Sequence, residues 1–110
     1  MKKTSFTQPS GEVISLYQDA DGTWCCLVCG SIELKDQPYY AEGGASFEMC
    51  SVCGFEFGFD DEPLASGTEI SGIRNNWIHW RKKLLTGASL EKARYDMLIE
   101  QLKNIEAPPA

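Results

Sequence analysis

The sequence predicts an α+β protein, with β structure in its first half and two helices in its second half. Two short Cys-x-x-Cys-Gly turns, each flanked by residues typical of strands, lie before residue 63. After it, apolar residues recur at the spacing of helical faces. With 110 residues, one domain is expected. Its parts would be an N-terminal arm and short strand (1–21), a ribbon (22–63) and a two-helix unit (64–106).

The first half carries short strand signals. Residues 1–11 are expected to form a loose arm, whereas the β-branched and aromatic content of residues 12–17 is typical of a strand. Further strands are expected to enter and leave each cysteine turn. After the second turn, the alternation of residue types predicts one apolar face formed by Phe55, Phe57 and Phe59.

Two helices are expected after Pro63. Ser66 and Glu69 fit a capping box at the start of the first helix, and Thr86-Gly87 is expected to end it. Ser89 is expected to cap the second helix, over residues 90–105. The apolar faces would be formed by Ile70, Ile73, Trp77, Trp80 and Leu84 in the first helix, and by Leu90, Ala93, Met97, Leu98, Leu102 and Ile105 in the second.

A basic run, Arg81-Lys82-Lys83, lies near the expected end of the first helix. Cations at this end interact favourably with the helix dipole, so we interpret the run as a solvated charge run. A phosphate contact beside Trp77 is the alternative interpretation.

The four cysteines of the two turns predict a metal site. Two Cys-x-x-Cys pairs match the spacing of tetrahedral sites, which most often hold zinc. We therefore expect one zinc ion per chain, with iron as the alternative. Because four protein ligands leave no open position on a tetrahedral ion, the site is expected to be structural, and no catalytic residues are predicted. The expected ligands are Cys26, Cys29, Cys50 and Cys53.

The choice between Cys25 and Cys26 is left open by spacing alone, since both precede Cys29. Cys26 gives the usual two-residue gap, whereas Cys25 would leave three residues between the ligands. We favour Cys26 and expect Cys25 to be a small buried side chain beside Trp24.

The charge of the chain indicates which kinds of partner it could bind. The net charge is -6, which disfavours general binding to nucleic acid and favours a protein with a basic surface. An acidic turn that follows the second cysteine pair could dock such a partner, or it could be solvated and guard a sheet edge. The residues concerned are Glu56, Asp60, Asp61 and Glu62.

The expected compartment is a reducing cytoplasm. The five cysteines are odd in number and lie in Cys-x-x-Cys pairs, which is typical of reduced proteins. No stretch of roughly 18 apolar residues occurs, so no transmembrane helix and no membrane partner are expected.

The second turn and its flanks resemble the small bacterial cysteine-rich CPCC family, whose members typically read S-x-E-I-C-P-x-C-G-F-E-x-G-x-D-D. The similar run spans residues 46–62, and the Arg74-x-x-Trp77 pair is similar to a helix of the family. Leu27 and Ser51 stand where the family has proline. The resemblance implies zinc binding in a zinc-ribbon-like β unit. By analogy with small acidic bacterial proteins of this sort, it suggests a toxin-neutralising immunity protein.

The two turns are also similar to those of rubredoxins, in which such pairs hold one iron for electron transfer. The helical second half is foreign to rubredoxins. The leading hypothesis is thus a non-enzymatic zinc protein that binds another protein. A rubredoxin-like electron carrier and a nucleic-acid-binding zinc ribbon are the alternatives.

Overall fold

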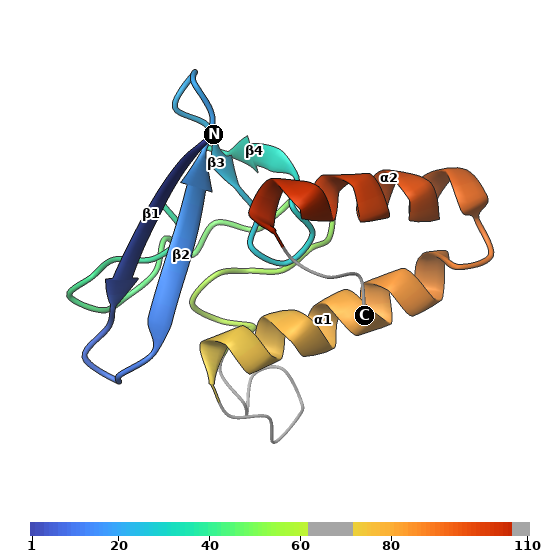
Figure 1. The fold of residues 1–110 in the computed structure, drawn as a ribbon. Helices are drawn as coiled ribbons and strands as arrows, with labels where there is room; N and C mark the ends of the chain where they lie inside the picture. The colour runs from blue at the N-terminus through green and yellow to red at the C-terminus, as the bar shows by residue number, and fades with distance from the viewer. Residues whose placement is uncertain (62–71, 107–110) are drawn as a thin grey trace.

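The computed structural model describes residues 1–61 and 72–106, and it confirms the α+β arrangement (Figure 1). A four-stranded antiparallel sheet has the order β1-β2-β3-β4, so every strand pairs with its neighbour in sequence. Two helices follow the sheet and lie to one side of it in Figure 1. The elements are β1 (Lys2–Thr7), β2 (Val13–Gln18), β3 (Trp24–Cys25), β4 (Ile32–Leu34), α1 (Ile73–Ala88), α2 (Lys92–Leu102) and a 3-10 turn, η1 (Lys103–Ile105).

The expectation of a loose N-terminal arm is wrong, because Lys2–Thr7 forms β1 and pairs with β2 along its whole length. The register runs from Lys2 opposite Gln18 to Thr7 opposite Val13, and the Ser5 and Ser15 hydroxyls lie 2.8 Å apart. Only Phe6 in β1 is even partly buried. An edge strand exposed on both faces carries no apolar alternation, and alternation is the signal by which a strand is recognised in sequence.

The segment after the second cysteine turn also departs from expectation. Phe55 and Phe57 are fully buried, but Phe59 is 51% exposed. Gly58 adopts a φ of 100° and reverses the chain between them, so the alternation of a strand does not continue. This part of the chain pairs across the turn through an isolated bridge between Met49 and Glu56.

The predicted capping box of Ser66 and Glu69 lies outside the described residues. The described residues show a contact to the N-terminus of α1 from the turn between β1 and β2. The Glu12 carboxylate accepts hydrogen bonds from the backbone N–H groups of Ile73 (2.9 Å) and Arg74 (2.8 Å). A carboxylate here satisfies two unpaired donors and complements the positive end of the helix dipole.

The boundary between the two helices differs from the prediction. The first helix continues through Gly87 to Ala88, and α2 begins only at Lys92. Ser89 does not cap α2, since its hydroxyl donates to the Thr86 carbonyl at the end of α1 (2.8 Å). Leu90 lies in the connection and is 96% exposed, so it is not part of the apolar face predicted for the second helix.

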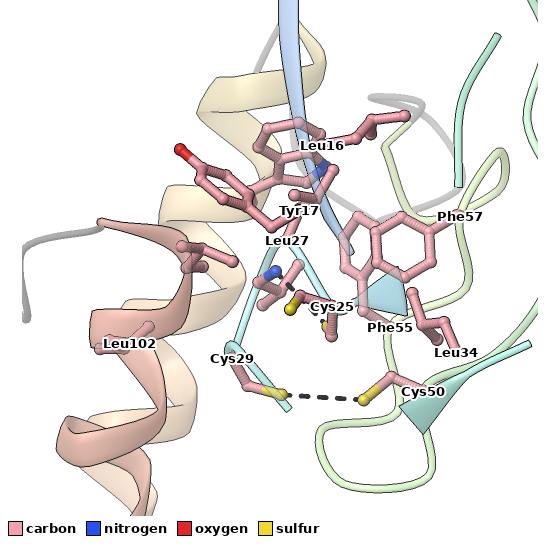
Figure 2. Close-up of a cluster of buried hydrophobic side chains, with 14 of the residues drawn as sticks. Leu16, Tyr17, Cys25, Leu27, Cys29, Leu34, Cys50, Phe55, Phe57 and Leu102 are labelled. Carbon is pink, nitrogen blue, oxygen red and sulfur yellow. Dashed lines mark hydrogen bonds between the residues drawn. The ribbon is translucent and has the colours of Figure 1, made fainter. Parts of the chain in front are cut away.

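The core lies between the sheet, the cysteine turns and the two helices. Figure 2 shows Leu16 of β2, Phe55 and Phe57, and Leu102 of α2 gathered around cysteine side chains. Trp77 is buried and Trp80 packs against the core, as their helical spacing predicts. Fully buried side chains contribute most of the apolar area that drives folding. They include Ile14, Leu16, Val28, Leu34, Tyr39, Phe55, Phe57, Leu98 and Leu102.

A buried polar network joins the first half of the chain to α1. The Tyr39 hydroxyl donates to the Asp61 carboxylate (2.5 Å) and accepts from the indole N–H of Trp77 (2.9 Å). The backbone N–H of Gly58 also donates to Asp61 (2.9 Å). Burial raises the pKa of Tyr39, and the neighbouring Asp61 acts in the same direction, so the phenol stays a donor.

Candidate metal centre

The first knuckle, residues 26–30, is a tight turn held by β3 and β4. The Cys26 N–H donates to the Ser31 carbonyl (2.8 Å), and the Gly30 N–H donates to the Cys26 carbonyl (2.9 Å). Gly30 adopts a φ of 84°, which a residue with a side chain rarely tolerates. The turn directs the Val28 N–H toward the Cys26 sulfur (3.4 Å).

The second knuckle, residues 50–54, repeats this geometry. The Cys50 N–H donates to the Phe55 carbonyl (2.9 Å), and the Gly54 N–H donates to the Cys50 carbonyl (2.8 Å). Gly54 has a φ of 79°, and the Cys53 N–H approaches the Cys50 sulfur (3.5 Å). The Cys-x-x-Cys-Gly pattern therefore specifies the same local turn at both places.

The two knuckles face each other and bring four sulfurs together. The Sγ atoms of Cys26, Cys29, Cys50 and Cys53 all lie within 4.8 Å of one another. The Cys26–Cys53 and Cys29–Cys50 pairs, the latter drawn as a dashed line in Figure 2, are each separated by 3.7 Å. A tetrahedral zinc with Zn–S bonds of about 2.3 Å requires sulfurs roughly 3.8 Å apart. The cluster therefore fits a tetrahedral, thiolate-bound ion.

The electrostatics of the cluster favour thiolates at some of its positions. The neighbouring thiol of Cys26 lowers the pKa of Cys50 to about 6, and the other thiols of the cluster, Cys26 above all, lower the pKa of Cys29 below its ordinary value. Burial raises the pKa of Cys26 above its ordinary value. Since thiolates are the ligands of zinc, binding of an ion would displace the remaining protons.

Cys25 lies outside this cluster. It is 1% exposed, and its thiol contacts the Met1 sulfur at 3.2 Å. Burial raises the pKa of Cys25 to about 11, so the side chain stays protonated at neutral pH. Of the two adjacent cysteines, the structure thus places Cys26 in the cluster and Cys25 in the apolar core.

Helix α1 contacts both knuckles through two consecutive residues. Arg81 is 7% exposed, and its guanidinium donates to the carbonyls of Val28 (2.7 Å, from Nε) and Leu27 (3.0 Å, from Nη2). The interpretation of Arg81 as part of a solvated charge run is therefore wrong, although Lys82 and Lys83 are exposed. The neighbouring Trp80 donates its indole N–H to the carbonyl of Cys53 (3.0 Å). Sequence reasoning missed both contacts, since neither residue type nor spacing identifies a carbonyl partner.

The acidic turn is not one exposed patch. Asp61 is 5% exposed, because its carboxylate serves the Tyr39 network described above. The Asp60 carboxylate accepts from the Glu56 backbone N–H (2.8 Å), and both side chains are half-buried. Glu62 lies outside the described residues. Only Glu56 and Asp60 of the predicted acidic set are therefore described at the surface.

Three large apolar side chains are exposed around the second knuckle; sequence reasoning did not single out two of them and placed the third, Phe59, on an apolar face with Phe55 and Phe57. Phe47 is 62% exposed, Met49 59% and Phe59 51%. Phe47 has a φ of 61°, unusual for a bulky residue, and its N–H donates to the Phe57 carbonyl (2.9 Å). We call these three residues the apolar rim. The pairing of this turn sets the positive φ of Phe47, and no local sequence pattern predicts it.

Comparison with known proteins adds one short match. No protein-family model matches the chain, and no solved structure matches it. A protein of Bacillus subtilis (strain 168), named "Uncharacterized protein YoaQ", is 40% identical over 40 residues. The match covers 36% of this chain and 34% of the Bacillus protein, so the chain spans about a third of the relative's length.

Within residues 1–61 and 72–106, no helix has both the length and the apolar character needed to span a membrane.

Proposed function

We propose that this chain is a non-enzymatic structural-zinc protein that acts as a protein–protein interaction module. The observation that carries the proposal is the four-cysteine cluster, whose sulfurs lie within 4.8 Å of one another. Four thiolates would fill every position of a tetrahedral ion and leave none for a substrate. A closed site of this kind contributes folding energy, so any function falls to the surfaces that it supports.

The surface around the second knuckle supports binding to a protein. The apolar rim of Phe47, Met49 and Phe59 places large, adaptable side chains in solvent, and Glu56 and Asp60 belong to the same part of the chain. Aromatic and methionine side chains are enriched in protein interfaces. The net charge of -6 would steer the chain toward a basic partner.

The more specific form of the proposal is an immunity protein that neutralises a bacterial toxin in a reducing cytoplasm. It depends on the resemblance to the CPCC family and on the chemistry of the surface. An acidic and apolar surface would cover a basic cleft on the toxin, with opposite charges increasing the rate of association.

Native metal content and partner capture test the proposal together. We expect one zinc per chain and a colourless protein. A partner captured by the wild-type chain from its native lysate should be lost with Glu56→Lys combined with Met49→Ser. It should be retained with Asp21→Lys, which makes the same charge change in the exposed turn between β2 and β3. Capture that is identical for all three proteins, or no capture by the wild type, would contradict a role for this surface.

A rubredoxin-like iron carrier is the second candidate, and the exposure of Cys53 favours it. Cys53 is partly exposed, whereas the other three sulfur ligands are buried. An exposed ligand would give electrons a short path to the surface. Four thiolates around oxidised iron are red, so a red native protein with iron in place of zinc would favour the carrier over the interaction module.

A further inference from the structure

Arg81 is a buried cation, and its environment sets it apart from the other charged residues of α1. Its side chain is 7% exposed, while Lys82 and Lys83 beside it are exposed. Burying a charge is costly unless the charge is hydrogen-bonded and balanced. Two carbonyls bind the guanidinium, but within residues 1–61 and 72–106 no carboxylate forms an ion pair with it. A nearby negative charge would stabilise a cation buried in this position.

The cysteine cluster would supply such a charge when it holds a metal ion. Four thiolates on one divalent ion carry a net charge of about -2. The carbonyls that bind Arg81 belong to Leu27 and Val28, the two residues between the first pair of ligands. The guanidinium is therefore bound to the backbone of the first knuckle itself.

The geometry of the contact also fixes the position of the ligands. A guanidinium is a rigid fork, so two bonds to consecutive carbonyls define the orientation of the turn between them. The indole of Trp80 holds the carbonyl of Cys53, and its ring packs edge-on against Phe55 at a centroid distance of 5.3 Å. Two consecutive residues of α1 thus each hold one knuckle.

From these contacts we infer that Arg81 is a positioning residue of the metal centre, which orients the first knuckle toward the second and offsets the excess negative charge of the bound thiolates. Trp80 has the corresponding positioning role for the second knuckle, without the charge. The inference rests on the proposed zinc site. It goes further in assigning the retention of the metal to a helix that contributes no ligand.

Zinc release from purified, zinc-loaded full-length protein tests the inference. Arg81→Met removes the charge and the fork, Arg81→Lys keeps the charge, and Lys82→Met is a matched control at an exposed position. The rate of zinc transfer to a colorimetric chelator is measured at pH 7, and the pH of half-release is measured in acid. Circular dichroism and zinc content establish that each variant is folded and loaded before release begins.

Substitution of a residue that supports a metal ligand typically lowers metal affinity by about 10–100-fold. We therefore expect Arg81→Met to release zinc at least about tenfold faster than the wild type. Its half-release should move to higher pH, because the thiolates lose a stabilising cation and take up protons more readily. Arg81→Lys should keep the pH of half-release near that of the wild type but still release zinc faster. Lys82→Met should match the wild type in both measurements.

Equal release rates and equal pH midpoints for Arg81→Met and Lys82→Met would overturn the role of Arg81. Trp80→Phe keeps the ring but removes the N–H, so it tests the second contact and is expected to speed release without moving the pH midpoint. If Arg81→Met cannot be purified in a folded state, Arg81→Lys decides, since wild-type release kinetics in that variant would exclude a positioning role. A wild-type chain that holds no zinc would instead overturn the metal site itself.

Discussion

The two knuckles share one turn geometry but differ in what surrounds them. Helical elements contact the first knuckle: Arg81 of α1 binds its carbonyls, and Asn104 of η1 donates to the Gly30 carbonyl (2.9 Å). A Cβ atom added to Gly30 would lie 2.1 Å from the carbonyl oxygen of Gln101 in α2. Within residues 1–61 and 72–106, the second knuckle accepts one such bond, from Trp80, and a Cβ atom on Gly54 would meet nothing within 4 Å.

The two knuckles therefore have different roles, although their sequence pattern is the same. The first knuckle is the part of the site on which the helices are assembled, and its two ligands are buried. The second knuckle faces solvent, with Cys53 and Ser51 accessible and the apolar rim around it. An ion between the knuckles would therefore fasten the exposed side to the helical core, so its loss should affect both.

Loss of one ligand should have the largest effect. Cys26→Ala removes a buried ligand from the cluster, whereas Cys25→Ala removes the adjacent buried thiol outside it. Structural zinc binding is worth about 10–16 kcal/mol in zinc-finger peptides, which is comparable to the whole stability of a domain. We expect Cys26→Ala to bind no zinc tightly and to lose its cooperative unfolding transition. Metal analysis and thermal unfolding measure both effects.

The adjacent cysteine provides the control for this experiment. Cys25→Ala should retain one zinc and lose only about 1–2 kcal/mol, the cost of a small cavity. If Cys25→Ala lost the metal and Cys26→Ala kept it, the assignment of the cluster would be reversed.

Substitution of the two knuckle glycines should have an effect of intermediate size on the free energy of unfolding, and the effect should differ between the two knuckles. Both glycines have positive φ, so alanine adds about 1–2 kcal/mol of backbone strain at either position. Only at Gly30 does the new Cβ meet the backbone of α2, and overpacking adds roughly 1–3 kcal/mol more. Chemical denaturation of the zinc-loaded proteins should therefore show a larger loss for Gly30→Ala than for Gly54→Ala. Equal losses in the free energy of unfolding would mean that the contact with α2 does not constrain the first knuckle.

Much of this arrangement could be predicted because it depends on local patterns. The knuckles, the cysteine cluster, the strand after Glu12 and the two helices follow from spacing and periodicity. Cys26 is in the cluster because its two-residue gap to Cys29 forms the usual turn. These features need only a few neighbouring residues to specify them.

The rest could not be predicted because distant partners decide it. Arg81 stands in a run of cations with the exposed Lys82 and Lys83, and it is buried where its guanidinium meets two carbonyls of the first knuckle. Asp61 belongs to an acidic run and is buried because Tyr39 and Gly58 donate to it. Phe59 follows the alternation of Phe55 and Phe57 but leaves the core because Gly58 turns the chain. For Arg81 and Asp61, tertiary contacts override the local signal, whereas for Phe59 the neighbouring glycine ends the alternation.

Removal of an exposed aromatic beside the second knuckle should have the smallest effect on stability. Phe59 is 51% exposed and Phe57 is fully buried, although they lie two residues apart. We expect Phe57→Ala to cost about 3–5 kcal/mol in the free energy of unfolding. Phe59→Ala should cost within about 0.5 kcal/mol, as most surface substitutions do. Comparable losses for the two would place Phe59 in the core and remove it from the apolar rim. A small loss for Phe59→Ala means that this side chain contributes little to folding, so it is free to contact a partner.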